Sequence, residues 1–195
     1  MIFSRTASTD DLEELDLKQN IIVYLEIPKK VENYSSALYK FWDYSLLLKL
    51  IKYYSLNESN ILNITNKNRD VTLDIISDYY SLNINQMSFG QFSKLPIKKN
   101  RFDIICSFGI LEHIKNPSVF VEKLSKHPNK GGFIIITTEE NISSTKKRTI
   151  TSEDLLSYSI LLEQMGYDLC SDEFDLLKYT ENSNLHSLVM KRIGN

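Results

Sequence analysis

The sequence predicts a single α/β domain whose sheet is mostly parallel and ends in an antiparallel hairpin. Apolar runs of strand length alternate with segments of helical periodicity, which is typical of a parallel sheet wound with helices. Two strand-like runs near residue 195 follow each other without a helix between them, which favours a hairpin. The chain is 42% hydrophobic and 25% charged, as expected for an ordinary globular domain with one core.

Residues 1–30 are expected to form an N-terminal extension to a domain that spans residues 31–195. The extension begins with polar and then acidic residues that offer few apolar side chains to bury. It also contains Asn20–Ile27, a compact apolar run whose length suits either a strand or a short buried segment.

The first long helix is expected over Ser36–Tyr54, because apolar residues recur there at helical spacing. One stripe of this helix consists of Tyr44, Leu47, Leu48 and Ile51. A short strand is expected over residues 60–64. A helix over residues 70–80 follows, with Asp70 as its N-cap.

The middle of the chain contains the clearest strand, the near-continuous apolar run Phe102–Phe108. Such a run is typical of a central parallel strand that is covered on both faces. Asn116 and Pro117 then supply an N-cap and a proline at the first helical position. The pair Gly131-Gly132 is expected to stop this helix and to lead into a second buried strand over residues 133–138.

The last third of the chain contains one more helix and the hairpin. Thr151 and Asp154 have the spacing of a capping box, and Gly166 is a natural helix terminator. Strands are expected over residues 167–174 and 185–193, with the last one antiparallel.

Charge and composition exclude several classes of partner. The net charge of −2 lacks the basic footprint of a nucleic-acid-binding protein, and no spaced ligand cluster indicates a metal site. No apolar stretch reaches the length of a membrane span, and the N-terminus is unlike a signal peptide. We therefore expect a cytoplasmic protein with buried free thiols at Cys106 and Cys170. Whether the protein forms a homo- or hetero-oligomer stays an open question.

The stretch Leu95–Thr138 resembles class I S-adenosylmethionine (SAM)-dependent methyltransferases. It contains an LP loop, Phe102-Asp103 at the start of a strand, Leu111-Glu112-His113 after it, and Gly131-Gly132 before the next strand, all in the family's order. The resemblance implies a Rossmann-like sheet, SAM as cofactor and methyl transfer. The segment Phe41–Tyr44 also resembles an aromatic helix of bacterial methyltransferases in glycan or natural-product pathways. This second resemblance implies a small-molecule or glycan-type acceptor. In the other interpretation, Trp42 simply packs on the domain.

The cofactor loop departs from the family pattern. In the family, the first strand ends in an acid followed by a glycine-rich loop, so that backbone can approach the methionine end of SAM. Here Asn63 stands where the acid belongs, and no glycine occurs between Met1 and Phe89. The resemblance assigns cofactor contacts to this segment, where Thr65, Asn66 and Asn68 replace small residues.

Two further family features are altered. Residues 79–102 contain no acid that could bind the ribose hydroxyls, and Gln91-Phe92 replace the acidic turn that meets the adenine. The spacing from Asn63 to His113 is also shorter than the family pattern by about one β-α unit. In a second possible register, residues 71–75 form the second strand and Asp74 is the ribose acid, although the crossover would then be short.

The resemblance places cofactor contacts at Ser107 and Phe108 and a catalytic pair at Glu112 and His113, after the central strand. Ligands bind at this edge of open α/β sheets. His113 could act as a general base, or the pair could cap the strand-to-helix loop; the latter is the favoured interpretation.

Two functions follow from these features. One is a SAM-dependent methyltransferase with an aberrant cofactor loop. The other is a catalytically inactive protein of the same fold that binds a partner. The missing glycines and acids predict that SAM binds weakly or not at all in the usual pose.

Overall fold

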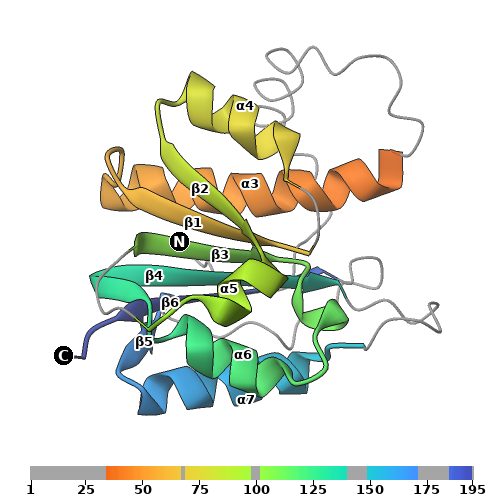
Figure 1. The fold of residues 1–195 in the computed structure, drawn as a ribbon, viewed down its shortest axis with the longest axis vertical. Helices are drawn as coiled ribbons and strands as arrows, with labels where there is room; N and C mark the ends of the chain where they lie inside the picture. The colour runs from red at the N-terminus through yellow and green to blue at the C-terminus, as the bar shows by residue number, and fades with distance from the viewer. Residues whose placement is uncertain (1–33, 67–68, 98–101, 140–148, 171–184, 195) are drawn as a thin grey trace.

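The computed structural model describes residues 34–66, 69–97, 102–139, 149–170 and 185–194 (Figure 1). The expected N-terminal extension, including Asn20–Ile27, lies outside this part of the chain, so the division at residue 30 stays a prediction.

The described strands form one six-stranded sheet in the order β2-β1-β3-β4-β6-β5 (Figure 1). The strands β2, β1, β3 and β4 are parallel, whereas β6 is antiparallel to both β4 and β5. This arrangement confirms the mostly parallel sheet with an antiparallel hairpin. The strands are β1 (Asn60–Thr65), β2 (Asn83–Ser88), β3 (Phe102–Phe108), β4 (Pro128–Glu139), β5 (Tyr167–Leu169) and β6 (Leu185–Arg192).

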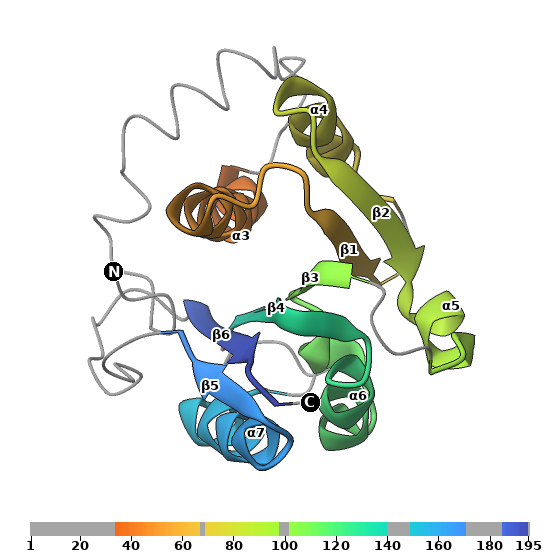
Figure 2. The same cartoon turned by 90° about the vertical axis from the view of Figure 1, so that its left-hand side faces the viewer.

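Helices cover both faces of the sheet, and each face has its own apolar cluster (Figure 2). On one face, α3 (Tyr34–Tyr54) and α4 (Val71–Tyr79) pack against the strands through Leu47, Leu50 and Leu73. On the other face lie α6 (Pro117–Leu124) and α7 (Ser152–Gln164). The short α5 (Phe89–Lys94) follows β2, and the 3-10 helix η1 (Leu111–His113) follows β3.

The sheet is shortened on the β2 side, as the spacing before His113 predicts. The described chain reaches β3 after a single intervening strand, β2, which pairs directly with β1 from Asn60↔Asn83 to Thr65↔Ser88. The alternative register is wrong, because Val71 begins a helix instead of a strand. The side chain of Asp70 caps that helix by accepting a hydrogen bond from the Leu73 amide.

The role predicted for Gly131-Gly132 is also wrong. The helix α6 already ends at Leu124, and both glycines lie inside β4. A Cβ at Gly132 would come within 2.9 Å of the backbone oxygens of Asn129 and Asp103, so the pair permits a close approach between β4 and β3. Gly131 has a φ of +78°, in the left-handed region that favours glycine.

The local helix signals and the thiol state are otherwise confirmed. Thr151 and Asp154 form a capping box at the start of α7, and Gly166, with φ of +84°, follows the end of that helix. Cys106 and Cys170 are both free and buried. Among the described helices, none has the length and apolarity needed to cross a bilayer.

Candidate cofactor site

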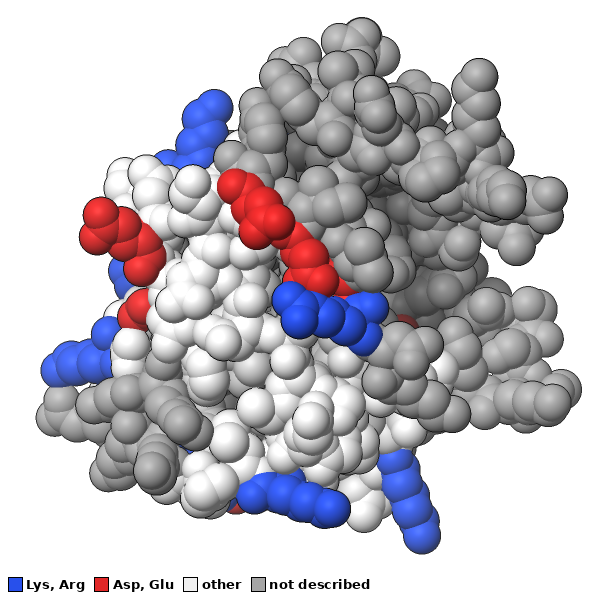
Figure 3. All heavy atoms as spheres, turned by 45° about the horizontal axis from the view of Figure 1, so that its top comes forward, with Lys and Arg blue, Asp and Glu red and all other residues white. Residues whose placement is uncertain are grey.

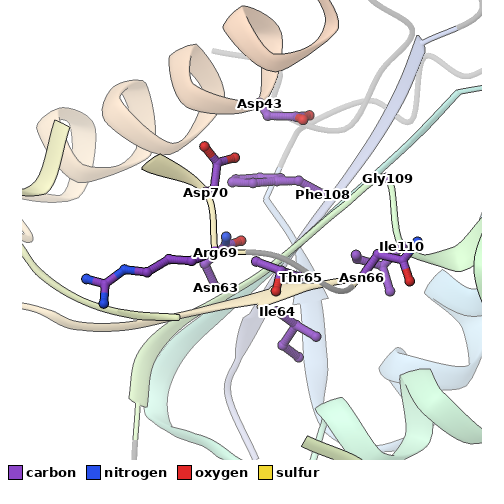
Figure 4. A pocket seen from close by; sticks show the side chains of 10 residues that line it. All are labelled: Asp43, Asn63, Ile64, Thr65, Asn66, Arg69, Asp70, Phe108, Gly109 and Ile110. Carbon is purple, nitrogen blue, oxygen red and sulfur yellow. The ribbon is translucent and has the colours of Figure 1, made fainter. Parts of the chain in front are cut away.

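A cavity of about 400 Å³ lies where β1 and β3 end, at the carboxyl edge of the parallel strands (Figure 4). Open α/β sheets bind ligands at this edge, and the volume falls within the range of small-molecule pockets. The lining residues come from α3, from the end of β1 and the segment that follows it, and from the end of β3 and the residues that follow it. They are Asp43, Asn63, Ile64, Thr65, Asn66, Arg69, Asp70, Phe108, Gly109 and Ile110.

The floor of the cavity contains a buried amide. Asn63 is only 2% exposed, and its Oδ1 has no hydrogen-bond partner among the described residues. Buried polar side-chain atoms are nearly always satisfied in native proteins. Since Asn63 also lines the cavity, a ligand that donates a hydrogen bond there would satisfy this oxygen.

Two carboxylates lie on the α3 side of the cavity, between that helix and the end of β1 (Figure 4). Asp43 belongs to α3 and is 8% exposed. Asp70 caps α4, and its Oδ2 accepts a 2.7 Å hydrogen bond from the hydroxyl of Tyr44. The wall opposite Asn63 is therefore acidic.

Hydrogen bonds from Gln86 of β2 fix the position of Asp70 in the acidic wall. The amide of Gln86 accepts from the backbone N–H of Asp70 and donates to its carbonyl, both at 2.7 Å. The same Nε2 also donates to Asp74 at 2.7 Å, and Arg69 Nε donates to the other oxygen of Asp74. The hydrogen bond from Arg69 lowers the pKa of Asp74, so this carboxylate stays charged at neutral pH.

The predicted cofactor residues that the structure describes divide into two groups. Asn63, Thr65, Asn66 and Phe108 line the cavity. Gln91, Phe92 and Ser107 do not, whereas Asn68 lies outside the described residues.

Local packing explains why Gln91, Phe92 and Ser107 are absent from the cavity. The Oε1 of Gln91 accepts from the backbone and hydroxyl of Ser88, which makes a capping box for α5. Phe92 is fully buried against the rings of Phe120 and His127. Ser107 is fully buried within β3.

The predicted catalytic pair lies in η1, after β3, and neither residue lines the cavity. Glu112 is 7% exposed and accepts a 2.7 Å hydrogen bond from the hydroxyl of Thr138, near the end of β4. His113 is exposed. The structure thus gives the two side chains different surroundings, and their roles in catalysis stay predictions.

Sequence reasoning missed the contribution of Asp43. The residue precedes Leu47 by one helical turn and therefore lies on the buried stripe of the predicted helix. A carboxylate on an apolar helix stripe is the signal that could have identified it, because acids are rarely buried without a role. The other lining residues that were not predicted are Ile64, Arg69, Asp70, Gly109 and Ile110.

Comparisons with known proteins agree with this architecture. Residues 25–190 match a family described as "Methyltransferase domain". The chain is 29% identical over 138 residues to the Dictyostelium discoideum protein "Ubiquinone biosynthesis O-methyltransferase, mitochondrial", a match that covers 71% of this chain but only 39% of that relative.

Solved structures share the fold at low identity. The DszA carbon methyltransferase has a TM-score of 0.55 at 9% identity, over 92% of this chain and 58% of that one. The Burkholderia thailandensis 1,6-didemethyltoxoflavin-N1-methyltransferase, solved with 1,6-didemethyltoxoflavin and S-adenosylhomocysteine, has a TM-score of 0.51 at 11% identity, over 96% and 92% of the two chains. The family match covers most of the chain, and the sheet order and the position of the cavity agree with it. The chain therefore belongs to the class I SAM-dependent methyltransferase family.

Proposed function

We propose that the chain binds SAM in the cavity between β1 and β3 and transfers its methyl group to a small-molecule acceptor. The observation that carries this proposal is the unsatisfied Oδ1 of Asn63, which faces an acidic wall at the carboxyl edge of the sheet. SAM has an α-ammonium group and a sulfonium, so its charge suits a wall formed by Asp43 and Asp70.

The amino-acid end of SAM fits the residues present. Asn63, Thr65 and Asp43 would hold this end, and Phe108 would pack beside it. The side chains that replace glycines leave a cavity of about 400 Å³. When bound, SAM supplies an electrophilic methyl group, and the chain contributes mainly by positioning the acceptor and excluding water.

The nucleoside end has fewer contacts. The strand β2 ends at Ser88, and residues 79–102 contain no carboxylate for the ribose hydroxyls. Gln91, which aligns with the adenine-binding acid, uses its side-chain oxygen to cap α5. We therefore expect the amino-acid end to contribute most of the binding free energy.

A small acceptor suits the described surface better than a nucleic acid does. Acidic and basic side chains are interspersed on the face shown in Figure 3. Among the described residues, Arg69 also forms an ion pair with Asp74. A nucleic-acid-binding face would instead gather Lys and Arg into one patch. Because the exposed His113 follows β3, it is the candidate general base for an oxygen or nitrogen nucleophile of the acceptor.

The missing ribose carboxylate favours a second function, in which the chain is an inactive binding or partner subunit. Calorimetric titration with SAM and with S-adenosylhomocysteine separates the two. Micromolar affinity for either ligand supports the methyltransferase, whereas no binding at millimolar ligand supports the inactive protein.

A variant pair tests whether the ligand occupies this cavity. Asn63→Leu removes the buried oxygen and should weaken binding about 10-fold or more, because the hydrogen bond to the ammonium is charge-assisted. Asn85→Leu, at an exposed position of β2, is the matched control. If both variants bind as the unmodified protein does, the ligand lies elsewhere.

A further inference from the structure

We infer that a groove between α5 and α6 binds an organic anion that has an apolar body and one carboxylate group. The groove has a volume of about 330 Å³ and lies between two helices that Figures 1 and 2 show as neighbours. This volume falls within the range of small-molecule pockets. The inference does not rest on the proposed function, because the groove shares no lining residue with the cavity between β1 and β3.

The groove follows one face of α6. This helix connects the parallel strands β3 and β4, so it starts near the carboxyl edge of the sheet and returns the chain toward the opposite edge. Asn116, Val119, Phe120 and Lys123 line the groove at spacings of three and four residues, which places them on one side of the helix. Lys123 lies in the last turn of α6, so the groove extends away from the edge at which the cofactor cavity lies.

Three phenylalanine rings form the apolar wall of the groove. The ring of Phe120 lies edge-to-face with those of Phe89 and Phe92, with centroids 5.5 and 5.7 Å apart. Phe92 and Phe120 are buried, so this wall is held in place by packing, whereas Val119 beside it is 63% exposed. An apolar ligand body placed here would remove the Val119 side chain from water, which favours binding.

Lys123 supplies a positive charge that is fixed against this wall. Its Nζ donates a hydrogen bond to the carbonyl oxygen of Ser93 in α5 and lies 5.4 Å from the centroid of the Phe92 ring. An ammonium group has three N–H donors, so a ligand carboxylate can accept another of them. Burial lowers the pKa of Lys123, because apolar surroundings disfavour the charged form, and a bound carboxylate would favour that form again.

The charge of the groove selects the class of ligand. The described lining residues include a second lysine, Lys115, and no acid. Both lysines would repel a cation. A neutral apolar molecule would cover the ammonium of Lys123 without offsetting the loss of its hydration. An anion with an apolar body satisfies the rings and the lysines together.

Octanoate and 1-octanol test this selection, because they have the same chain length and differ in the carboxylate. We expect the unmodified protein to bind octanoate at least about 10-fold more tightly, which is the range for one charge-assisted contact. The backbone amide signals of Val119 and Lys123 in nitrogen-15 spectra follow both titrations and locate the ligand.

Removing the cation should affect only one of the two probes. Lys123→Met keeps much of the side-chain volume and should weaken octanoate binding about 10-fold while leaving 1-octanol binding unchanged, which a merely structural role for Lys123 would not do. Lys126→Met is the matched control, since Lys126 pairs with Glu122 and does not line the groove. If Lys123→Met binds both probes as the unmodified protein does, the inference is overturned.

A second variant removes the apolar part of the site without relying on Lys123. Val119→Asp places a carboxylate beside the phenylalanine rings and should abolish binding of both probes, and the exposure of Val119 should leave the fold intact. Ile160→Asp, at a position of α7 that is 48% exposed, is the matched control. Unchanged octanoate binding in Val119→Asp would place the ligand elsewhere and overturn the inference.

The remaining outcomes separate this inference from the proposed function. Equal affinity for octanoate and 1-octanol, or no shift at millimolar octanoate, overturns the inference and leaves the proposed function standing. Displacement of octanoate by S-adenosylhomocysteine would make the groove part of the cofactor site, which also overturns it. Octanoate binding by a protein that does not bind S-adenosylhomocysteine supports the inference and disproves the proposed function alone.

Discussion

The hydroxyl of Tyr44 donates a 2.7 Å hydrogen bond to Oδ2 of Asp70, which ties α3 to the start of α4 beside the cavity. Tyr44 follows Asp43 directly in α3. The same helical turn therefore contributes the Asp43 carboxylate to the cavity and, through Tyr44, a hydrogen bond to Asp70, which caps α4. The relative position of the two acids therefore depends on this hydroxyl.

Tyr44→Phe should weaken S-adenosylhomocysteine binding several-fold while costing only about 1 kcal/mol of stability, because the buried ring stays and one hydrogen bond is lost. Calorimetry and chemical denaturation measure the two effects. Tyr53→Phe, on the exposed side of the same helix, is the control and should change neither. Unaltered binding in Tyr44→Phe would show that the cap does not position the acids.

Gly132→Ala should destabilise the protein by about 1–3 kcal/mol, since the new Cβ would lie 2.9 Å from two backbone oxygens that cannot move aside easily. Gly90→Ala is the matched control: it lies in α5, where a Cβ meets nothing within 4 Å, and should be neutral or slightly stabilising. Denaturation midpoints compare the two variants. Equal stability would remove the explanation given for the glycine in β4.

The cysteines should resist thiol reagents until the protein unfolds. Burial raises the pKa of Cys106 well above its usual range and that of Cys170 to about 12. Both therefore stay protonated and covered at pH 8, and Ellman's reagent should label them only in denaturant. Rapid labelling of the native protein would contradict this prediction.

The raised pKa values of the two cysteines also predict how the stability of the protein depends on pH. The native thiols keep protons that unfolded thiols lose above about pH 8.5, so the folded state binds more protons there. Stability should fall as the pH rises from about 8.5 toward 12. Cys170→Ala should reduce the slope in denaturation experiments at pH 8 and pH 10, and an unchanged slope would argue against the contribution of Cys170.

Glu112 and His113 should respond differently to truncation. Glu112→Ala leaves the hydroxyl of Thr138 without its acceptor and should cost about 1–3 kcal/mol. His113→Ala, at an exposed position, should change stability by less than about 0.5 kcal/mol. Loss of methyl transfer in His113→Ala with unchanged melting would identify the histidine as the functional member of the pair.

The sequence allowed most of the sheet to be predicted, because strands that are buried on both faces must be apolar along their length. Phe102–Phe108 is the clearest case. The helix α4 could be predicted for a local reason as well, since its cap, Asp70, lies next to it in the chain. The role of the glycine pair was predicted wrongly because the residue that requires a glycine lies far away in the sequence. The backbone oxygen of Asp103, in the neighbouring strand, leaves no room for a Cβ at Gly132.

The site was predicted only in part, because its charges come from separate elements. Asn63 and Phe108 lie at or near the ends of neighbouring strands and could be found from the family pattern. Asp43 lies far upstream, and only the packing of α3 on the sheet brings it to the cavity. Gln91 does not line the cavity, because its side-chain oxygen caps α5, and its predicted contact with the cofactor stays a prediction.

The strand β6 lies between β4 and β5 although it follows both of them in the chain. During synthesis on the ribosome, β4 therefore emerges long before the strand that covers its second edge. Until residues 185–192 have left the exit tunnel, that edge is an unpaired row of backbone groups beside the apolar side chains of β4. The nascent chain should thus depend on chaperones during this interval and complete its sheet only after Arg192 has emerged.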